Sequence, residues 1–218
     1  CGFSAAASNL YAGRVITMGT LIAIYLSTSD EMLPVMISAK APVILILEVL
    51  GTKVLVGMAA GFVIDLICKA GTGEHLHIHE MCEEEHCECE KGIVHSAFRH
   101  TVHVGIFLLL ITFILDFLLE MVGEDVLANL LLNRPVLGPV VAGAVGLIPN
   151  CAASVAITEL YLGGMLGAGS MLAGLLVGAG VGLLVLFHVN HHTRENLKIV
   201  GILYCVGVLT GIVVEYLI

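Results

Sequence analysis

Residues 151–176 read CAASVAITELYLGGMLGAGSMLAGLL, and residues 1–26 read CGFSAAASNLYAGRVITMGTLIAIYL. The two stretches align without a gap at an offset of 150 residues. Identical residues recur at Cys1, Ser4, Ala6, Leu10, Tyr11, Gly13, Gly19, Ala23 and Leu26 of the first stretch. Farther along, the same offset relates Gly57, Gly61 and Asp65 to Gly207, Gly211 and Glu215. The alternative is chance similarity between apolar stretches, but chance seldom keeps cysteine, tyrosine, glycine and an acidic residue in register. The sequence therefore predicts an internal repeat.

The repeat divides the chain into three parts. Residues 1–68 are expected to form the C-terminal part of a first membrane repeat, and residues 95–218 a second membrane repeat. Residues 69–94 form a polar linker rich in His, Cys and Glu. The counterpart of 95–150 should precede Cys1, so the first repeat is expected to be incomplete at its N-terminus and to belong to a longer protein.

The composition is that of a membrane protein. Of 218 residues, 58% are hydrophobic and 12% are charged, and the mean hydropathy is +1.03. A soluble domain carries roughly 25% charged residues, so we expect lipid to solvate most of this chain. The net charge of -9 is concentrated in the linker, and no basic stripe is present, which argues against nucleic-acid binding. The lipid bilayer is the expected partner, and a homo-oligomer is compatible with the sequence.

Apolar runs and helix breakers predict an all-α polytopic fold. Long helices are expected over 95–121, 165–188 and 197–218. Residues 136–149 and 151–162 are short and marked by Gly and Pro, which predicts two half-helices meeting at a break. Each repeat then crosses the membrane an odd number of times, and the polar linker does not cross, so the repeats must be inverted. Inverted repeats with broken helices are typical of secondary transporters.

The first candidate site is the pair of breaks. In the second repeat it comprises Asn150, Cys151 and Ser154, and in the first repeat Cys1 and Ser4. Irregular backbone inside a membrane is tolerated where protein or a water-filled cavity surrounds it, and a thiolate near a helix N-terminus is a soft ligand. The alternative is that small Cys and Ser side chains only allow close helix packing.

The second candidate site consists of carboxylates in apolar segments. Asp30 and Glu31 follow three hydroxyl residues and precede Pro34, while Asp116, four residues before Glu120, and Glu159 lie in the second repeat. Ionisable groups inside membrane segments are costly and are therefore candidates for binding a cation or carrying a proton. The alternative for Asp30 and Glu31 is a helix end at the membrane interface, where water solvates carboxylates.

The linker is a candidate metal-binding loop. Its potential ligands alternate closely along the chain: His75, His77, His79, Cys82, His86, Cys87 and Cys89. Such tracts bind Zn²⁺ or softer ions without a preformed fold. The alternative is a solvated acidic linker. No cofactor is expected to be required, and the metal ion would be either substrate or loop ligand.

Three motifs carry a resemblance to a known family. They are the stretch Cys1-Gly2-Phe3-Ser4-Ala5-Ala6-Ala7, the stretch Ser27-Thr28-Ser29-Asp30-Glu31-Met32-Leu33-Pro34, and the triplet Pro149-Asn150-Cys151. Together with the His/Cys/Glu loop, they make the chain resemble bacterial ten-helix heavy-metal exporters, members of which are labelled arsenic efflux proteins or manganese transporters. The resemblance covers essentially the whole chain. It implies export of a metal or metalloid without fixing which.

The leading hypothesis is therefore a secondary transporter, or permease, of the bacterial plasma membrane that exports manganese or arsenite by alternating access. Carboxylates favour manganese and cysteines favour arsenite, so the sequence leaves the ion open. A non-transporting metal sensor that uses the loop is the alternative. An enzyme is not expected, because His79-Glu80 is not followed by the histidine that a metalloprotease helix requires. The distribution of Lys and Arg places the loop in the cytoplasm.

Overall fold

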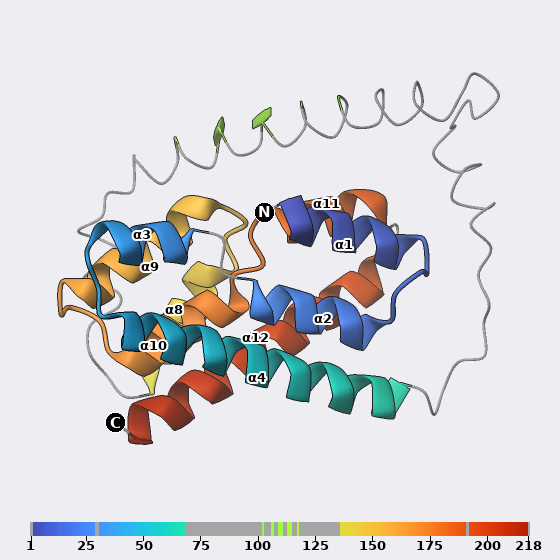
Figure 1. Cartoon of the computed structure of the whole chain (residues 1–218). Helices are drawn as coiled ribbons and strands as arrows, with labels where there is room; N and C mark the ends of the chain where they lie inside the picture. Colours follow the sequence, from blue (N-terminus) through green and yellow to red (C-terminus); the bar gives the residue numbers. More distant parts are fainter. Residues whose placement is uncertain are drawn as a thin grey trace.

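The computed structural model describes residues 2–28, 31–68, 136–190 and 192–217, with separate positions between 102 and 117 (Figure 1). This described part is helical and contains no strand. The first half comprises α1 (Gly2–Ala12), α2 (Met18–Ser27), α3 (Met32–Ser38) and α4 (Val43–Cys68). The second half comprises α8 (Leu137–Gly146), α9 (Cys151–Leu162), α10 (Ala168–Val177), α11 (Val181–Val189) and α12 (Thr193–Leu217).

The order of helices repeats along the chain at the offset seen in the sequence. Helices α2 and α10 begin and end 150 residues apart, at Met18 and Ala168 and at Ser27 and Val177. The pairs α1 and α9, α3 and α11, and α4 and α12 agree with this offset to within one residue at each end. The aligned sequence stretches therefore form the same local structure twice.

Four helical segments are long and apolar enough to cross a membrane. They are Met18–Ser38, Val43–Cys68, Ala168–Val189 and Thr193–Leu217. The segment Ala168–Val189 is largely buried at the centre of the bundle, whereas few residues of α4 and α12 are buried and both helices carry exposed large apolar side chains. This is the pattern of a membrane protein, because an exposed helix with an apolar outer face needs lipid as its solvent.

One predicted helix is wrong, because the structure forms two helices in its place. The apolar run predicts a single helix over 165–188, but α10 ends at Val177 and α11 begins at Val181. Between them, Gly180 has a φ of 53°, a left-handed conformation that glycine adopts without steric cost. The half-helices predicted over 136–149 and 151–162 correspond to α8 and α9, and the last helix begins at Thr193 rather than at 197. The helix predicted over 95–121 lies outside the described residues apart from isolated helical positions.

Glycines allow α2 to pack closely against α4, and α10 against α12. A Cβ built on Gly61 would lie 2.7 Å from the carbonyl oxygen of Gly19. A Cβ on Gly211 would lie 2.5 Å from that of Gly169, the equivalent contact in the second half. Acidic residues complete both interfaces. Asp65 Oδ1 accepts a hydrogen bond of 3.0 Å from Gly19 N, and Glu215 Oε2 accepts one of 3.1 Å from Ser170 N. Both carboxylates thus cap the positive N-terminal end of a neighbouring helix.

The two halves are joined by crossed helix pairs. Helix α1 of the first half packs against α11 of the second, and α9 of the second half packs against α3 of the first. Figure 1 shows these pairs at the upper right and the upper left of the bundle. Since α1 is equivalent to α9 and α3 to α11, each half contributes the same two helices to the contact between the halves.

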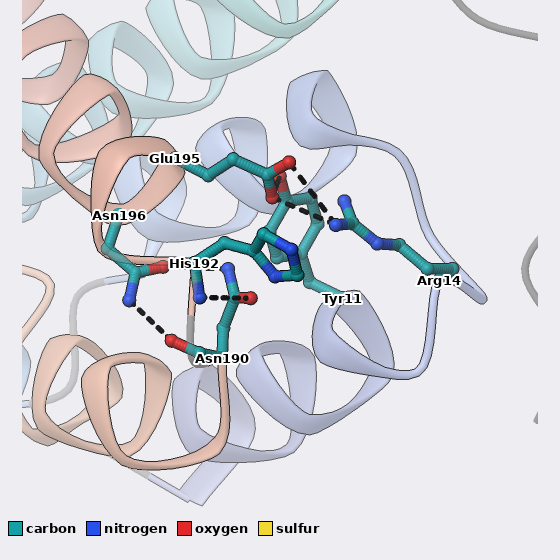
Figure 2. Close-up of polar contacts among 6 residues, drawn as sticks. All are labelled: Tyr11, Arg14, Asn190, His192, Glu195 and Asn196. Atoms are coloured by element: carbon teal, nitrogen blue, oxygen red, sulfur yellow. Dashed lines mark hydrogen bonds and ion pairs between the residues drawn. The ribbon is translucent and has the colours of Figure 1, made fainter. Parts of the chain in front are cut away.

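A polar cluster anchors the end of α1 to the start of α12 (Figure 2). Arg14 Nη2 lies 3.0 Å from Glu195 Oε2, and Tyr11 donates a hydrogen bond of 3.4 Å to the same carboxylate oxygen. Burial lowers the pKa of Arg14, but its hydrogen bond with Glu195 and the charge of that carboxylate outweigh burial and raise the pKa above its ordinary value. Arg14 has a φ of 55°, and its equivalent in the second half, Gly164, has a φ of 72°.

The backbone at Arg14 gives a test of this cluster. Arg14→Ala and Arg14→Gly both remove the ion pair, but only alanine keeps a Cβ in the left-handed conformation. We expect Arg14→Gly to be more stable than Arg14→Ala by about 1 kcal/mol. The measurement is denaturant unfolding of the two purified variants in detergent. An alanine variant as stable as the glycine variant would contradict the expected strain.

Candidate functional site

A small polar cavity lies where three helix breaks meet. The breaks are those between α2 and α3, between α8 and α9, and between α10 and α11. The cavity has a volume of about 20 Å³, close to the space that one water molecule needs. Its polar side chains are Thr28, Glu31, Lys53, Asn150 and Ser154, and glycines form much of the remaining wall.

The start of α9 supplies two of these side chains. Asn150 is the N-cap of α9, is 5% exposed, and its Oδ1 accepts a hydrogen bond of 3.2 Å from Ala152 N. Ser154 Oγ lies 2.9 Å from the carbonyl oxygen of Cys151 and 3.5 Å from Glu31 Oε2. The Ser154 hydroxyl can therefore donate to either oxygen. The positive N-terminal end of α9 favours a carboxylate at this place.

Glu31 is brought to the cavity from the other half of the chain. It is the N-cap residue of α3 and is partly buried. It lies 123 residues from Ser154 in the sequence, and the packing of α3 on α9 brings the two side chains together. The acidic motif of the first half and the break at Asn150 of the second half thus contribute to one cavity.

Lys53 is the site residue that sequence reasoning missed. It lies within α4, is 1% exposed, and donates hydrogen bonds to the carbonyl oxygens of Thr28 at 2.5 Å and Leu175 at 2.8 Å. The available signal was that Lys53 is the single Lys or Arg in the apolar run 43–68. A basic residue in such a run is a functional candidate by default.

The remaining candidates lie elsewhere. Ser4 is buried at the contact between α1 and α11, and its Cβ lies 2.7 Å from the position that a Cβ on Gly182 would occupy. Its side chain does not line the polar cavity. Glu159 is exposed on α9. Cys151 is partly buried at the first position of α9, and its side chain is not part of the cavity wall.

Several predicted site residues lie outside the described residues. These are Cys1, Asp30 and Asp116, together with the loop ligands His75, His77, His79, Cys82, His86, Cys87 and Cys89. Within the ranges that the structure does describe, no three His, Cys, Asp or Glu residues gather in a way that could hold a metal ion. The loop therefore stays a prediction.

The repeat-related side of the bundle does not reproduce the ionisable groups of the cavity. At the 150-residue offset, Val181 takes the place of Glu31 and Leu203 that of Lys53. On the equivalent side of the bundle, Tyr25 Oη lies 2.6 Å from Ser8 Oγ and donates to the carbonyl oxygen of Gly182 at 3.1 Å. A tyrosine hydroxyl and a serine thus fill that place, whereas the other side retains a cavity with ionisable walls.

The side chains at the cavity form an oxygen-rich donor set. Glu31 offers a carboxylate, Asn150 an amide oxygen, and Thr28 and Ser154 hydroxyls; Lys53 adds an ammonium group to the wall, and the described cavity wall contains no thiol. Carboxylate, carbonyl and hydroxyl oxygens suit hard cations such as Mg²⁺, Ca²⁺ and Mn²⁺, whereas thiolates suit softer ions. Comparison of the chain with protein-family models, with curated proteins and with solved structures returned no match.

Proposed function

We propose that the protein is a multi-pass secondary transporter of the bacterial plasma membrane that exports a hard divalent cation of the manganese class. The substrate ion would contact Glu31, Asn150 and Ser154. The observation that carries this proposal is the small cavity at the meeting point of three helix breaks, to which both halves contribute polar side chains. Secondary transporters bind their substrates at such meeting points of broken helices, near the middle of the membrane.

The arrangement of the halves supports alternating access by inverted repeats. The crossed pairs α1 with α11 and α3 with α9 are those that a two-fold axis between the halves would generate. In Figure 1, α4 runs from left to right, whereas its equivalent α12 runs back to the left. Equivalent helices with opposite directions are expected when this axis lies in the plane of the membrane.

The oxygen donors favour manganese over arsenite. An arsenite exporter would need thiolates at the cavity, and the nearest described thiol, that of Cys151, is not part of its wall. Mn²⁺ accepts carboxylate, amide and hydroxyl oxygens as ligands. The linker over 69–94 would then concentrate metal ions near the transporter without forming the transport site.

The direct test is the metal content of a strain that expresses the protein. Cells are challenged separately with Mn²⁺, Zn²⁺ and arsenite, and the retained element is measured by mass spectrometry. We expect retained manganese to fall severalfold relative to cells with an empty vector, and Glu31→Gln to abolish the fall because it removes the carboxylate from the cavity. Glu48→Gln is the matched control, since Glu48 is an exposed glutamate on α4.

Two other results would redirect the proposal. If retained arsenite falls and Cys151→Ser abolishes that effect, the metalloid alternative is correct and the oxygen donors are not the substrate ligands. If no element changes, export of a metal or metalloid is wrong. A variant lacking residues 74–90 separates transport from sensing, because a transporter without this loop should still lower the retained metal.

A further inference from the structure

We infer that the carbonyl oxygens of Thr28 and Leu175 form a seat for a monovalent cation, and that the ammonium group of Lys53 is its tethered occupant. The inference rests on the proposed function and deepens it. The seat adjoins the proposed substrate cavity, and the Lys53 ammonium group would take the place of a free coupling cation such as Na⁺. Its test measures binding and does not require transport.

The seat lies between the ends of two equivalent helices. Thr28 is the C-cap residue of α2, and Leu175 lies in the last turn of α10. The last carbonyl groups of a helix have no partner within that helix and carry the negative end of its dipole. Helices α2 and α10 therefore direct two negative ends toward one point, and Lys53 Nζ occupies this point at 2.5 Å and 2.8 Å from the two oxygens.

The position of Lys53 makes a purely structural role a poor explanation. A lysine near the middle of a membrane-crossing helix usually costs free energy unless its charge is used. The equivalent residue in the second half, Leu203, is also fully buried, so the fold itself accepts an apolar side chain at this place. Membrane transporters bind free cations at the C-terminal ends of broken helices, and here a covalently attached cation stands at such ends.

The seat also joins the two halves of the protein. Lys53 and Thr28 belong to the first half, and Leu175 belongs to the second. The Glu31 carboxylate lines the same cavity as Lys53. Because the ammonium group contacts one carbonyl oxygen of each half, movement of one half against the other would break one of these hydrogen bonds. The position of the cation is thereby coupled to the movement. A transporter of this design would not depend on Na⁺ or K⁺.

The experiment empties the seat and offers it a free ammonium ion. Lys53→Ala removes a propylammonium fragment, so n-propylammonium is the probe, and thermal unfolding of the purified full chain in detergent is the measurement. At saturating probe, we expect the unfolding midpoint of Lys53→Ala to rise by about 5 °C or more. The wild-type midpoint should not rise, because its seat is filled.

Three controls define the site. Leu203→Ala creates a buried space at the equivalent position of the second half, where the native residue is leucine and not lysine. We therefore expect n-propylammonium not to stabilise this variant. Neutral 1-propanol fills space without charge, and tetramethylammonium carries charge without an N–H donor, so neither should stabilise Lys53→Ala. Equal stabilisation of all variants, stabilisation by 1-propanol, or no stabilisation of folded Lys53→Ala would each overturn the inference.

A misfolded Lys53→Ala variant also gives a decisive result. Monodisperse protein that is recovered only when n-propylammonium is present during purification supports the seat. If neither condition gives folded protein, Lys53→Arg and Lys53→Met are compared, because only arginine keeps a cation with donors. Recovery of folded Lys53→Arg at more than tenfold the yield of Lys53→Met supports the inference, and equal yields contradict it. Absence of metal export in cells would refute the proposed function and leave these binding results standing.

Discussion

Replacement of Gly211 by leucine is expected to separate α12 from α10 and to destabilise the protein by about 3 kcal/mol or more. A Cβ at Gly211 would lie 2.5 Å from the carbonyl oxygen of Gly169 and 2.6 Å from Ala173 Cβ. These neighbours are backbone and a short side chain, so neither can move aside without shifting a helix. Thermal unfolding in detergent, followed by circular dichroism, measures the loss.

The same helix supplies the control. Gly201 is exposed on α12, and a Cβ built there meets nothing within 4 Å, so we expect Gly201→Leu not to destabilise the protein and, through the higher helix propensity of leucine, to stabilise it by up to about 1 kcal/mol. The repeat supplies a second matched pair on α4. Gly61→Leu should be as damaging as Gly211→Leu, and Gly51→Leu as harmless as Gly201→Leu. Similar effects of the crowded and the open positions would contradict the described packing.

If the protein transports metal as proposed, substitution of Ser154 by cysteine is expected to change the ion that it selects. The Ser154 hydroxyl lines the polar cavity, 3.5 Å from Glu31 Oε2, so Ser154→Cys would place a soft ligand beside the proposed substrate. Thiolates favour Zn²⁺ and Cd²⁺ over Mn²⁺. We expect the ratio of Zn²⁺ to Mn²⁺ flux to rise by about tenfold, which corresponds to about 1.4 kcal/mol of differential binding.

Flux into proteoliposomes loaded with a metal-sensitive dye measures this ratio directly. Ser38→Cys is the control, since Ser38 is exposed at the end of α3 and does not line the cavity. An unchanged ratio for Ser154→Cys, with flux retained, would show that the substrate does not contact this side chain. A rise of the same size for Ser38→Cys would assign the effect to the added thiol in general.

Part of the candidate site could be predicted from the sequence because its residues interrupt apolar helices. Pro149 and Asn150 mark a break on their own, and Glu31 is conspicuous as an acid beside Pro34. The sequence does not say which break meets which acid. The structure brings Glu31 and Ser154 to one cavity, whereas Ser4, which has the same local sequence context as Ser154, packs near Gly182 instead. Lys53 stands out as the single Lys or Arg in its apolar run, but the main-chain carbonyls of Thr28 and Leu175 that it contacts have no signature in a sequence.

The helical class, the apolar segments and the repeat at 150 residues can be read from the sequence alone, because hydrophobic runs, glycine positions and breakers are local properties of a chain. It did not determine the break at Gly180, since a run such as 165–188 is apolar whether it forms one helix or two, and a left-handed φ leaves no mark beyond glycine itself. The structure was needed to show that the packing of α3 on α9 and of α4 on α2 brings Glu31, Asn150 and Lys53 to one cavity. Contacts across 123 residues of sequence depend on how whole helices pack, and packing is a property of facing surfaces rather than of either stretch alone.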